Sequence, residues 1–297
     1  MSEPHYLLKA MLWKLLDSFI LSVLLLLGTL LAKDSNPLQV VFLVNLLAAT
    51  FAIICCSHGQ WQRIKPSKPS LHFIRGLLGV TSTVCLLWAL QYLHFAEVTA
   101  IGFLTPALTA VLALWLFGEQ KRWTDFIVLA LNMVGVFLIL SPYLSSPADM
   151  SDQNSWIGIL FSLLAVLLLV IYNINLKKIG EQDTVVAQMV FGPLCSACLL
   201  LPLMYWWWQP LSLQAWGLLG LYGALLTVKL AARYWSFQQS QLSRLMPLEY
   251  SQMLFSAALG YLFLGQSLGA LAIAGILVIL CSSLTHLWRN SLQELPE

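Results

Sequence analysis

The chain has 297 residues, of which 59% are hydrophobic and 9% are charged, and its mean hydropathy is +0.81. Soluble domains carry about a quarter charged residues and about half apolar residues, so this composition excludes a soluble protein and indicates one embedded in a bilayer. The net charge of +2 is too small to indicate nucleic acid as a partner.

Ten apolar blocks follow one another along the chain, each close to the length of about 20 residues that a transmembrane helix needs. The predicted helices cover residues 12–32, 37–56, 71–93, 96–117, 124–141, 155–176, 184–206, 216–239, 243–264 and 268–288. Most connections between them are short, which favours antiparallel packing of successive helices. The sequence therefore predicts an all-α integral membrane protein with ten transmembrane helices.

Basic residues fall almost entirely on one side of this predicted topology. If the N-terminus is cytoplasmic, Lys33 lies on the far side, whereas eleven basic residues lie in cytoplasmic segments. These eleven are Lys9, Lys14, Arg63, Lys65, Lys68, Arg75, Lys121, Arg122, Lys177, Lys178 and Arg289. Cytoplasmic loops carry the excess of lysine and arginine, so we expect a multi-pass protein of the inner or plasma membrane with both termini in the cytoplasm.

The two halves of the sequence match each other at a fixed offset of 147 residues. The matching pairs include Gly76 and Gly223, Trp88 and Trp235, Gln91 and Gln238, Phe103 and Tyr250, and Gly118 and Gly265. Such pairs indicate a duplication, with a first repeat over 1–147 and a second over 148–297. Each repeat holds five predicted helices, so the second enters the membrane in the opposite direction. Inverted repeats are typical of alternating-access transporters, which bind substrate near the bilayer midplane.

Several motifs at equivalent places in the two repeats resemble a known transporter family. The first repeat contains RGLLG at 75–79, WALQY at 88–92, AIGFLTP at 100–106 and LFGE at 116–119. The second contains PLEY at 247–250 and GYLFLGQ at 260–266. These motifs are similar to those of EamA-type ten-helix members of the drug/metabolite transporter superfamily. The resemblance implies transport of small organic solutes and leaves the substrate open.

The chain departs from the family pattern at Gln266, where the resemblance implies a glutamate. Glu119 is the matching residue of the first repeat. If that carboxylate only caps a helix end, glutamine is a tolerable replacement. If the carboxylate titrates during transport, the second repeat has lost it.

Two basic residues fall inside a predicted helix and are the first candidates for a substrate site. Lys229 lies near the middle of helix eight, and Arg233 lies four residues further on, hence on the same face. A charge near the bilayer centre is costly unless it is paired or solvated. We therefore interpret both residues as lining a cavity that attracts an anionic group such as a carboxylate. The alternative is a purely structural role, in which they neutralise Asp17 or Glu249.

Two acidic residues are candidates to complete this site. Glu249 lies early in helix nine, just after Pro247, and it could carry a coupling proton, pair with Lys229 or accept an ammonium group. Asp17 lies in the first helix, three residues after Lys14. That spacing permits a local ion pair at the membrane interface, and the other role open to Asp17 is contact with a cationic substrate group.

Proline and aromatic residues occupy related places in the two repeats. Pro106 is predicted near the centre of helix four, and Pro247 near the start of helix nine. Helices interrupted at related places point to a central binding site, and ordinary kinking is the alternative. The aromatic candidates for substrate binding are Trp88, Trp235, Phe103 and Tyr250. Such rings stack on planar groups or hold an alkylammonium by cation–π attraction.

These residues together predict a secondary transporter of a small organic metabolite that works by alternating access, with a coupling proton or counter-substrate. An amphoteric solute suits the site: an amino acid, or a nucleoside-like one such as S-adenosylmethionine, to whose carriers the chain bears a likeness. The alternatives are an exporter of hydrophobic amines, which a midplane Lys229 would repel, and a polytopic membrane enzyme. No GxxxxGK(S/T), HExxH or GxSxG motif occurs, so we expect no enzyme activity, cofactor or metal site. The sequence leaves the oligomeric state and the direction of transport open.

Overall fold

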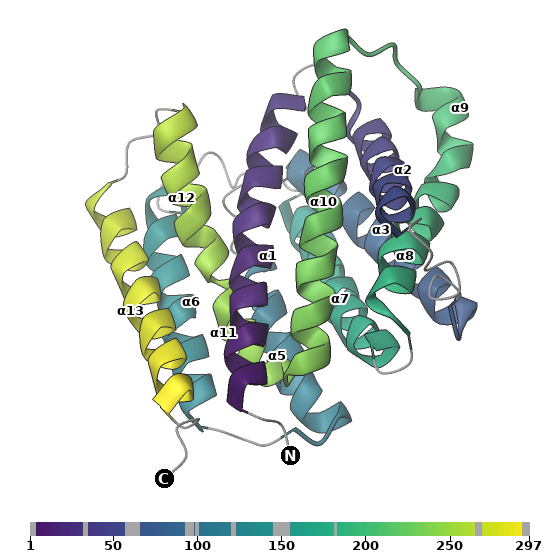
Figure 1. Cartoon of the computed structure of the whole chain (residues 1–297). Coiled ribbons are helices and arrows are strands. Elements are labelled where there is room, and N and C mark those ends of the chain that lie inside the picture. The colour runs from purple at the N-terminus through teal and green to yellow at the C-terminus, as the bar shows by residue number, and fades with distance from the viewer. Residues whose placement is uncertain are drawn as a thin grey trace.

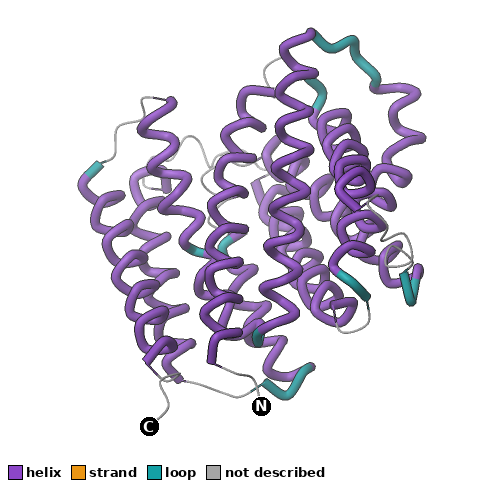
Figure 2. Tube along the Cα trace, in the orientation of Figure 1, coloured by secondary structure: helices purple, strands orange, loops and turns teal. Residues whose placement is uncertain are grey.

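The computed structural model describes residues 4–31, 35–56, 66–92, 98, 101–119, 123–144, 155–180, 183–264 and 269–292, and all regular structure in these ranges is helical (Figure 2). The first half contains α1 (Pro4–Leu31), α2 (Pro37–Cys56), α3 (Pro69–Tyr92), α5 (Leu104–Leu116) and α6 (Trp123–Leu144). The second half contains α7 (Ser155–Gly180), α8 (Val185–Leu200), the 3-10 helix η2 (Leu201–Leu203), α9 (Met204–Trp207), α10 (Leu213–Gln239), α11 (Leu242–Glu249), α12 (Ser251–Leu264) and α13 (Ala270–Leu292).

Six of the described helical segments are long and apolar enough to cross a membrane. They are Leu7–Gly28, Pro37–Cys55, Pro69–Ala89, Trp156–Gly180, Val185–Trp207 and Leu213–Gln239. Shorter apolar helices cover Leu104–Leu116, Trp123–Leu138 and Ile273–Ser282. Many large apolar side chains are exposed on the outside of the bundle, as lipid contact requires. The prediction of an all-α, multi-pass membrane protein is confirmed at this level.

Local sequence features set where several helices begin. Pro37 and Pro69 are the first residues of α2 and α3, a position where a missing backbone N–H costs no helical hydrogen bond. The hydroxyl groups of Thr184 and Ser212 each accept a hydrogen bond from the backbone N–H three residues on, at 3.2 Å. These two side chains cap α8 and α10 and fix the ends of the connections before them.

The helices pack in pairs that recur between the two halves (Figure 1). Helix α3 packs along α7 as α10 packs along α1, and α3 crosses α8 as α10 crosses α2. Under the offset of 147 residues α3 corresponds to α10, so these two contacts of α3 with helices of the second half have equivalents in the contacts of α10 with helices of the first. Helices α6 and α13 pack on each other at one side of the bundle, on the left of Figure 1.

Two glycines that match at this offset allow the helix backbones to approach closely where α3 crosses α8 and where α10 crosses α2. A Cβ on Gly76 would lie 2.9 Å from the Cβ of Cys195 in α8, and a Cβ on Gly223 would lie 2.6 Å from the Cβ of Leu47 in α2. Interiors packed this densely have no room for an added methyl group at such distances. The duplicated glycines therefore have a packing role at both crossings.

We expect Gly223→Ala to destabilise the protein by about 1–3 kcal/mol, because the added Cβ forces α10 away from α2. Gly220→Ala is the matched control, since nothing lies within 4 Å of a Cβ at Gly220 and alanine favours the helix. Thermal unfolding of both variants in one detergent measures the difference. Equal melting temperatures for the two variants would show that this crossing does not depend on close approach.

Predicted helix four is broken at Phe103 and predicted helix nine at Tyr250, and these two residues match at the offset of 147 residues. Residues 101–102 are helical, Phe103 is a turn residue and α5 begins at Leu104. Tyr250 is likewise a turn residue between α11 and α12. The expected place of Pro106 was therefore wrong: it lies in the first turn of α5, where no helical hydrogen bond is lost. Pro247 lies inside α11, three residues before its break.

Two basic residues that were assigned to cytoplasmic segments are buried instead. The side chain of Lys14 is 0% exposed and that of Arg75 is 1% exposed. Helix α1 begins at Pro4 and not near residue 12, and α3 begins at Pro69 and not at 71, so both residues lie deeper than predicted. The charge asymmetry between the two sides therefore rests on other basic residues.

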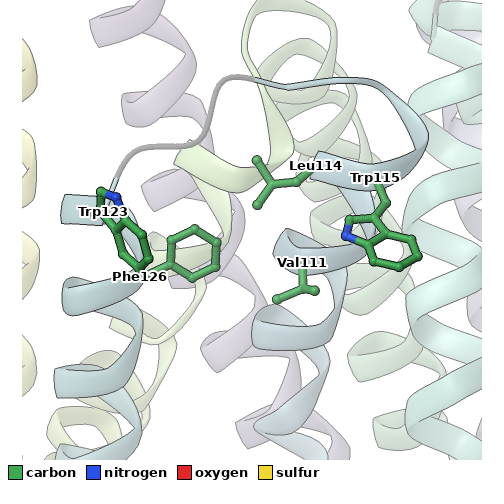
Figure 3. Close-up of a pocket in the computed structure, with 5 residues that line it drawn as sticks. All are labelled: Val111, Leu114, Trp115, Trp123 and Phe126. Carbon is green, nitrogen blue, oxygen red and sulfur yellow. The ribbon is translucent and has the colours of Figure 1, made fainter.

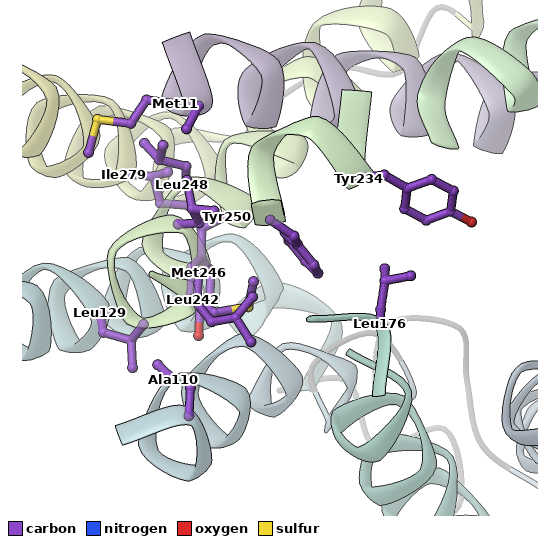
Figure 4. Close-up of a cluster of buried hydrophobic side chains, with 14 of the residues drawn as sticks. Met11, Ala110, Leu129, Leu176, Tyr234, Leu242, Met246, Leu248, Tyr250 and Ile279 are labelled. Carbon is purple, nitrogen blue, oxygen red and sulfur yellow. The ribbon is translucent and has the colours of Figure 1, made fainter. Parts of the chain in front are cut away.

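A large buried apolar cluster surrounds α11 (Figure 4). Leu242, Leu245, Met246 and Leu248 of this short helix are all fully buried, because α1, α5, α6 and α10 pack around it. Tyr250 belongs to the same cluster. The break between α11 and α12 is therefore held deep inside the bundle.

Candidate substrate-binding site

Five charged residues meet inside the bundle, where α1, α10 and α11 pack together. Lys14 and Asp17 lie on one face of α1, Lys229 and Arg233 lie on one face of α10, and Glu249 is the last residue of α11. The side chains of Lys14 and Asp17 are fully buried, whereas the other three keep 10–14% of their surface exposed. The accessible face of this charged cluster is therefore formed by Lys229, Arg233 and Glu249.

The carboxylate of Asp17 is shared by all three cations of the cluster. Lys14 Nζ donates to Oδ2 at 2.9 Å, and Arg233 Nε donates to Oδ2 at 3.0 Å and to Oδ1 at 3.2 Å. Lys229 Nζ lies 3.6 Å from Oδ1. Asp17 therefore holds together three groups that would otherwise repel one another.

Glu249 pairs with two of the same cations. Arg233 Nη2 donates to Oε1 at 3.2 Å, and Lys14 Nζ lies 3.2 Å from Oε2. Lys14 and Arg233 thus bridge both carboxylates and tie α1, α10 and α11 into one charged network. The structural role that the sequence left open for Arg233 matches this placement.

Lys229 has the weakest ties in the cluster. Its one ion pair with a described residue is the 3.6 Å contact with Asp17, which is beyond hydrogen-bond distance. An ammonium group has three donors, and no hydrogen bond from this one to the described part of the chain is found. Lys229 lies ten residues before the end of α10 at Gln239, or about 15 Å along the axis and so near the middle of a bilayer core.

The cluster contains three basic and two acidic residues, so these five carry a formal charge of +1. A buried charge without a counter-charge is costly even after the protein relaxes around it. An anionic group placed at the exposed side of Lys229 would supply the acceptor that its ammonium lacks. The cluster is therefore a site that can bind a carboxylate.

Polar side chains satisfy carbonyl groups near the break after α11. Asn132 Nδ2 of α6 donates to the Pro247 carbonyl at 2.9 Å, and Ser22 Oγ of α1 donates to the Gln252 carbonyl at 2.9 Å. Ser282 of α13 in turn donates to the side-chain oxygen of Asn132. Irregular backbone at membrane depth needs such partners, and here they come from helices of both halves.

The matching residues Phe103 and Tyr250 contact each other. Their rings are stacked with centroids 5.6 Å apart, and Tyr250 Oη donates to the Phe103 carbonyl at 2.9 Å. Contact between equivalent residues of two repeats places the pair where the repeats face each other. Tyr250 directly follows Glu249, so the pair positions the break beside the charged cluster, and Phe103 covers one face of the Tyr250 ring.

The two tryptophans of the candidate site lie elsewhere. Trp88 is 50% exposed and packs edge-on against Phe161, and Trp235 is 38% exposed and packs against Trp13. No contact of either ring with the charged cluster is found among the described residues. Their placement therefore gives no support for a role beside Lys229, and half-exposed tryptophans on a membrane protein contact lipid or its headgroups.

Sequence reasoning missed a buried polar group around Arg75. Its Nη2 donates to the Gln188 carbonyl at 2.7 Å, and its guanidinium lies 5.3 Å from the ring centre of Tyr234. Gly192 leaves the space for it, because a Cβ there would lie 1.1 Å from Nη2. Its Nη1 has no hydrogen-bond partner among the described residues. The one available signal was a basic residue within an apolar block.

Asp183 joins the start of α3 to the connection between α7 and α8. Its carboxylate accepts a hydrogen bond from the Ser67 N–H at 2.6 Å and lies 2.8 Å from His72 Nε2. Burial raises the pKa of Asp183, but these hydrogen bonds outweigh burial and hold the pKa below its usual value of 3.8. The carboxylate is therefore ionised at neutral pH and fixes this end of the bundle.

Glu119 has the capping role that the sequence left open for it. Its two carboxylate oxygens accept hydrogen bonds from the N–H groups of Leu242 and Ser243, each at 2.9 Å. A carboxylate at the first residues of α11 satisfies free N–H groups and complements the helix dipole. Gln266, its counterpart, lies outside the described residues.

An apolar pocket elsewhere is a poor candidate for a polar solute. It has a volume of about 280 Å³ and is lined by Val111, Leu114 and Trp115 of α5 and by Trp123 and Phe126 of α6 (Figure 3). Trp115 and Trp123 are each 83% exposed, so the pocket opens at the outside of the bundle. Its lining suits a lipid chain.

Comparison with known proteins decides the family. Residues 8–141 and 156–287 each match the EamA-like transporter family. The chain belongs to this family. The resemblance to EamA-type members of the drug/metabolite transporter superfamily is thereby confirmed, and the two matches fall in the two halves of the sequence.

Several characterised proteins are similar to this EamA-like transporter. The S-adenosylmethionine uptake transporter of Rickettsia prowazekii is 23% identical over 225 residues, which cover 74% of this chain and 72% of the relative. The pseudopaline exporter CntI of Pseudomonas aeruginosa is 22% identical over 220 residues, covering 72% of this chain and 74% of the relative. A solved crystal structure that is 17% identical superimposes with a TM-score of 0.79 over 92% of this chain and 96% of the other, which shows a shared fold.

Proposed function

We propose that this EamA-like transporter is a secondary active transporter that carries a small amphoteric solute by alternating access. The solute is an amino acid or a nucleoside-like metabolite such as S-adenosylmethionine. The observation that carries the proposal is the Lys229 ammonium, which lies near mid-membrane without a hydrogen bond to a described residue and shares the accessible face of the cluster with Glu249. Lys229 binds the carboxylate of the solute, and Glu249 accepts its cationic group or a coupling proton.

The architecture that we propose is ten transmembrane helices in two inverted repeats, 1–147 and 148–297. The separate family matches in the two halves support it, as do the equivalent contacts of α3 and α10. The contact between Phe103 and Tyr250 supports a central axis between the repeats. Both termini lie in the cytoplasm of a bacterial inner or other plasma membrane, as the excess of basic residues on one side indicates.

The printed functions of the two bacterial relatives support a metabolite as the cargo. One is an uptake transporter for S-adenosylmethionine and the other exports pseudopaline. Import and export both occur among these relatives, so the direction of transport is left to measurement. The buried cations disfavour the export of hydrophobic amines, because a cationic cargo would meet Lys229 and Arg233.

The test is a thermal-shift screen of the purified protein against amino acids, S-adenosylmethionine and quaternary amines. We expect an amphoteric compound to raise the melting temperature of wild type and of Lys178→Ala, but not that of Lys229→Ala. Lys178 is an exposed lysine near the end of α7 and so provides the matched control. Uptake of the stabilising compound into proteoliposomes then measures transport directly. Stabilisation of all three proteins by quaternary amines alone would replace this proposal with amine export.

A further inference from the structure

The charged cluster has one positive charge for which no described carboxylate remains. Lys14 and Arg233 each contact both Asp17 and Glu249, so the two acids are already matched by two bases. Lys229 is the third base, and its single described ion pair is the long contact with Asp17. The surplus charge of the cluster is therefore located at its exposed lysine.

A further buried cation adds to this surplus. Arg75 lies over the ring of Tyr234, the residue that follows Arg233 on α10. No ion pair of Arg75 with a described carboxylate is found, and its Nη1 has no partner in that part of the chain.

We propose that the site selects solutes of net charge −1, such as amino dicarboxylates, over neutral zwitterions and over cations. This inference rests on the proposed function and names its substrate class. In an interior of low dielectric constant, the total charge of site and solute decides the cost of enclosing them. A solute with two carboxylates and one ammonium brings the charge of the five-residue cluster to zero. A zwitterion leaves +1, and S-adenosylmethionine, with its sulfonium, leaves +2.

The geometry gives each group of such a solute a partner. One carboxylate accepts hydrogen bonds from the Lys229 ammonium, which makes none to the described residues. The ammonium lies against Glu249, whose side chain keeps 14% of its surface exposed. The second carboxylate pairs with Arg233, whose side chain keeps 10% of its surface exposed. A neutral amide at that place offers the guanidinium one uncharged oxygen as acceptor, whereas a carboxylate offers two oxygens and a negative charge.

The experiment compares pairs of probes that share a shape and differ by one charge. Apparent affinities are measured by thermal-shift titration with L-glutamate and L-glutamine, L-aspartate and L-asparagine, and S-adenosylmethionine. We expect glutamate to bind wild type about tenfold or more tightly than glutamine, because each unit of unmatched buried charge is unfavourable. S-adenosylmethionine is expected to bind more weakly than glutamine.

Two variants at the same position locate the origin of this preference. Lys229→Met removes the surplus charge and weakens the binding of both solutes, and glutamate is expected to lose more affinity than glutamine. Lys229→Arg keeps the charge and is expected to keep the preference for glutamate. Equal binding of glutamate and glutamine by wild type, or an unchanged preference for glutamate in Lys229→Met, would overturn the inference and leave the proposed transport function standing. If quaternary amines stabilise the protein and no amino acid or S-adenosylmethionine does, the proposed function itself fails.

Discussion

Replacing Asp17 with asparagine is expected to destabilise the protein by about 3–5 kcal/mol, as loss of one partner from a buried ion pair does. Asp17 is fully buried, and Lys14, Arg233 and Lys229 all point to it. Without its charge, Glu249 alone faces three cations. Asparagine has the shape of aspartate, so the loss reports the charge and not the packing. The melting temperature of the purified variant in detergent measures the effect.

A second substitution shows whether Asp17→Asn destabilises the protein through repulsion between the remaining cations or through disturbed packing around residue 17. Asp17→Asn combined with Lys229→Met is expected to be more stable than Asp17→Asn alone, because one of the repelling cations has been removed. The control is Asp183→Asn, a buried acid outside the cluster, which should lose the same amount of stability with and without Lys229→Met. Asp17→Asn with the melting temperature of wild type would mean that the cluster is not ionised as described.

The two lysines of the cluster are expected to differ in what their removal does to the stability of the protein. Lys14→Met should destabilise by about 1–3 kcal/mol, because Lys14 hydrogen-bonds Asp17 and contacts Glu249. Lys229→Met should leave stability unchanged or raise it, because Lys229 is the surplus charge and an apolar side chain often replaces a buried charge without loss. The same variant should lose the stabilisation by a carboxylate-bearing solute.

In this comparison each of the two lysines is replaced by methionine. The melting temperature of each variant is then measured with and without L-glutamate. Removing a residue that serves binding and not stability should abolish stabilisation by the ligand without lowering the melting temperature of the free protein. If Lys229→Met melted as far below wild type as Lys14→Met, Lys229 would be a structural cation like the other two. Retained stabilisation by L-glutamate in Lys229→Met would place the carboxylate elsewhere.

Much of the fold could be predicted from the sequence, because apolar length and the 147-residue offset are local and repetitive signals. The same holds for four members of the charged cluster. Lys229, Arg233, Asp17 and Glu249 were each conspicuous as a charge within an apolar block, and the structure brings all four together. The equivalence of Phe103 and Tyr250 also followed from the offset, although their mutual contact did not.

The rest of the site depended on information that a linear pattern lacks. Lys14 looked like an interfacial lysine because the first helix was predicted to begin near residue 12, and its start at Pro4 moves Lys14 into the bundle. Arg75 looked cytoplasmic for the same reason. The placement of Trp88 and Trp235 away from the charged cluster depends on which face of each helix meets its neighbours, and apolar residues on every face gave no sign of it.

The hydrogen bond between Tyr250 and Phe103 makes the two repeats unequal in a simple way. Tyr250 carries the hydroxyl that donates to the Phe103 carbonyl, and Phe103 has no hydroxyl with which to return the bond. If the repeats exchange their conformations during transport, the mirror state lacks this one interaction. A net hydrogen bond contributes about 1 kcal/mol, which corresponds to a ratio of about five between two populations. Under the proposed mechanism, a single missing oxygen atom would therefore favour one of the two conformations over the other.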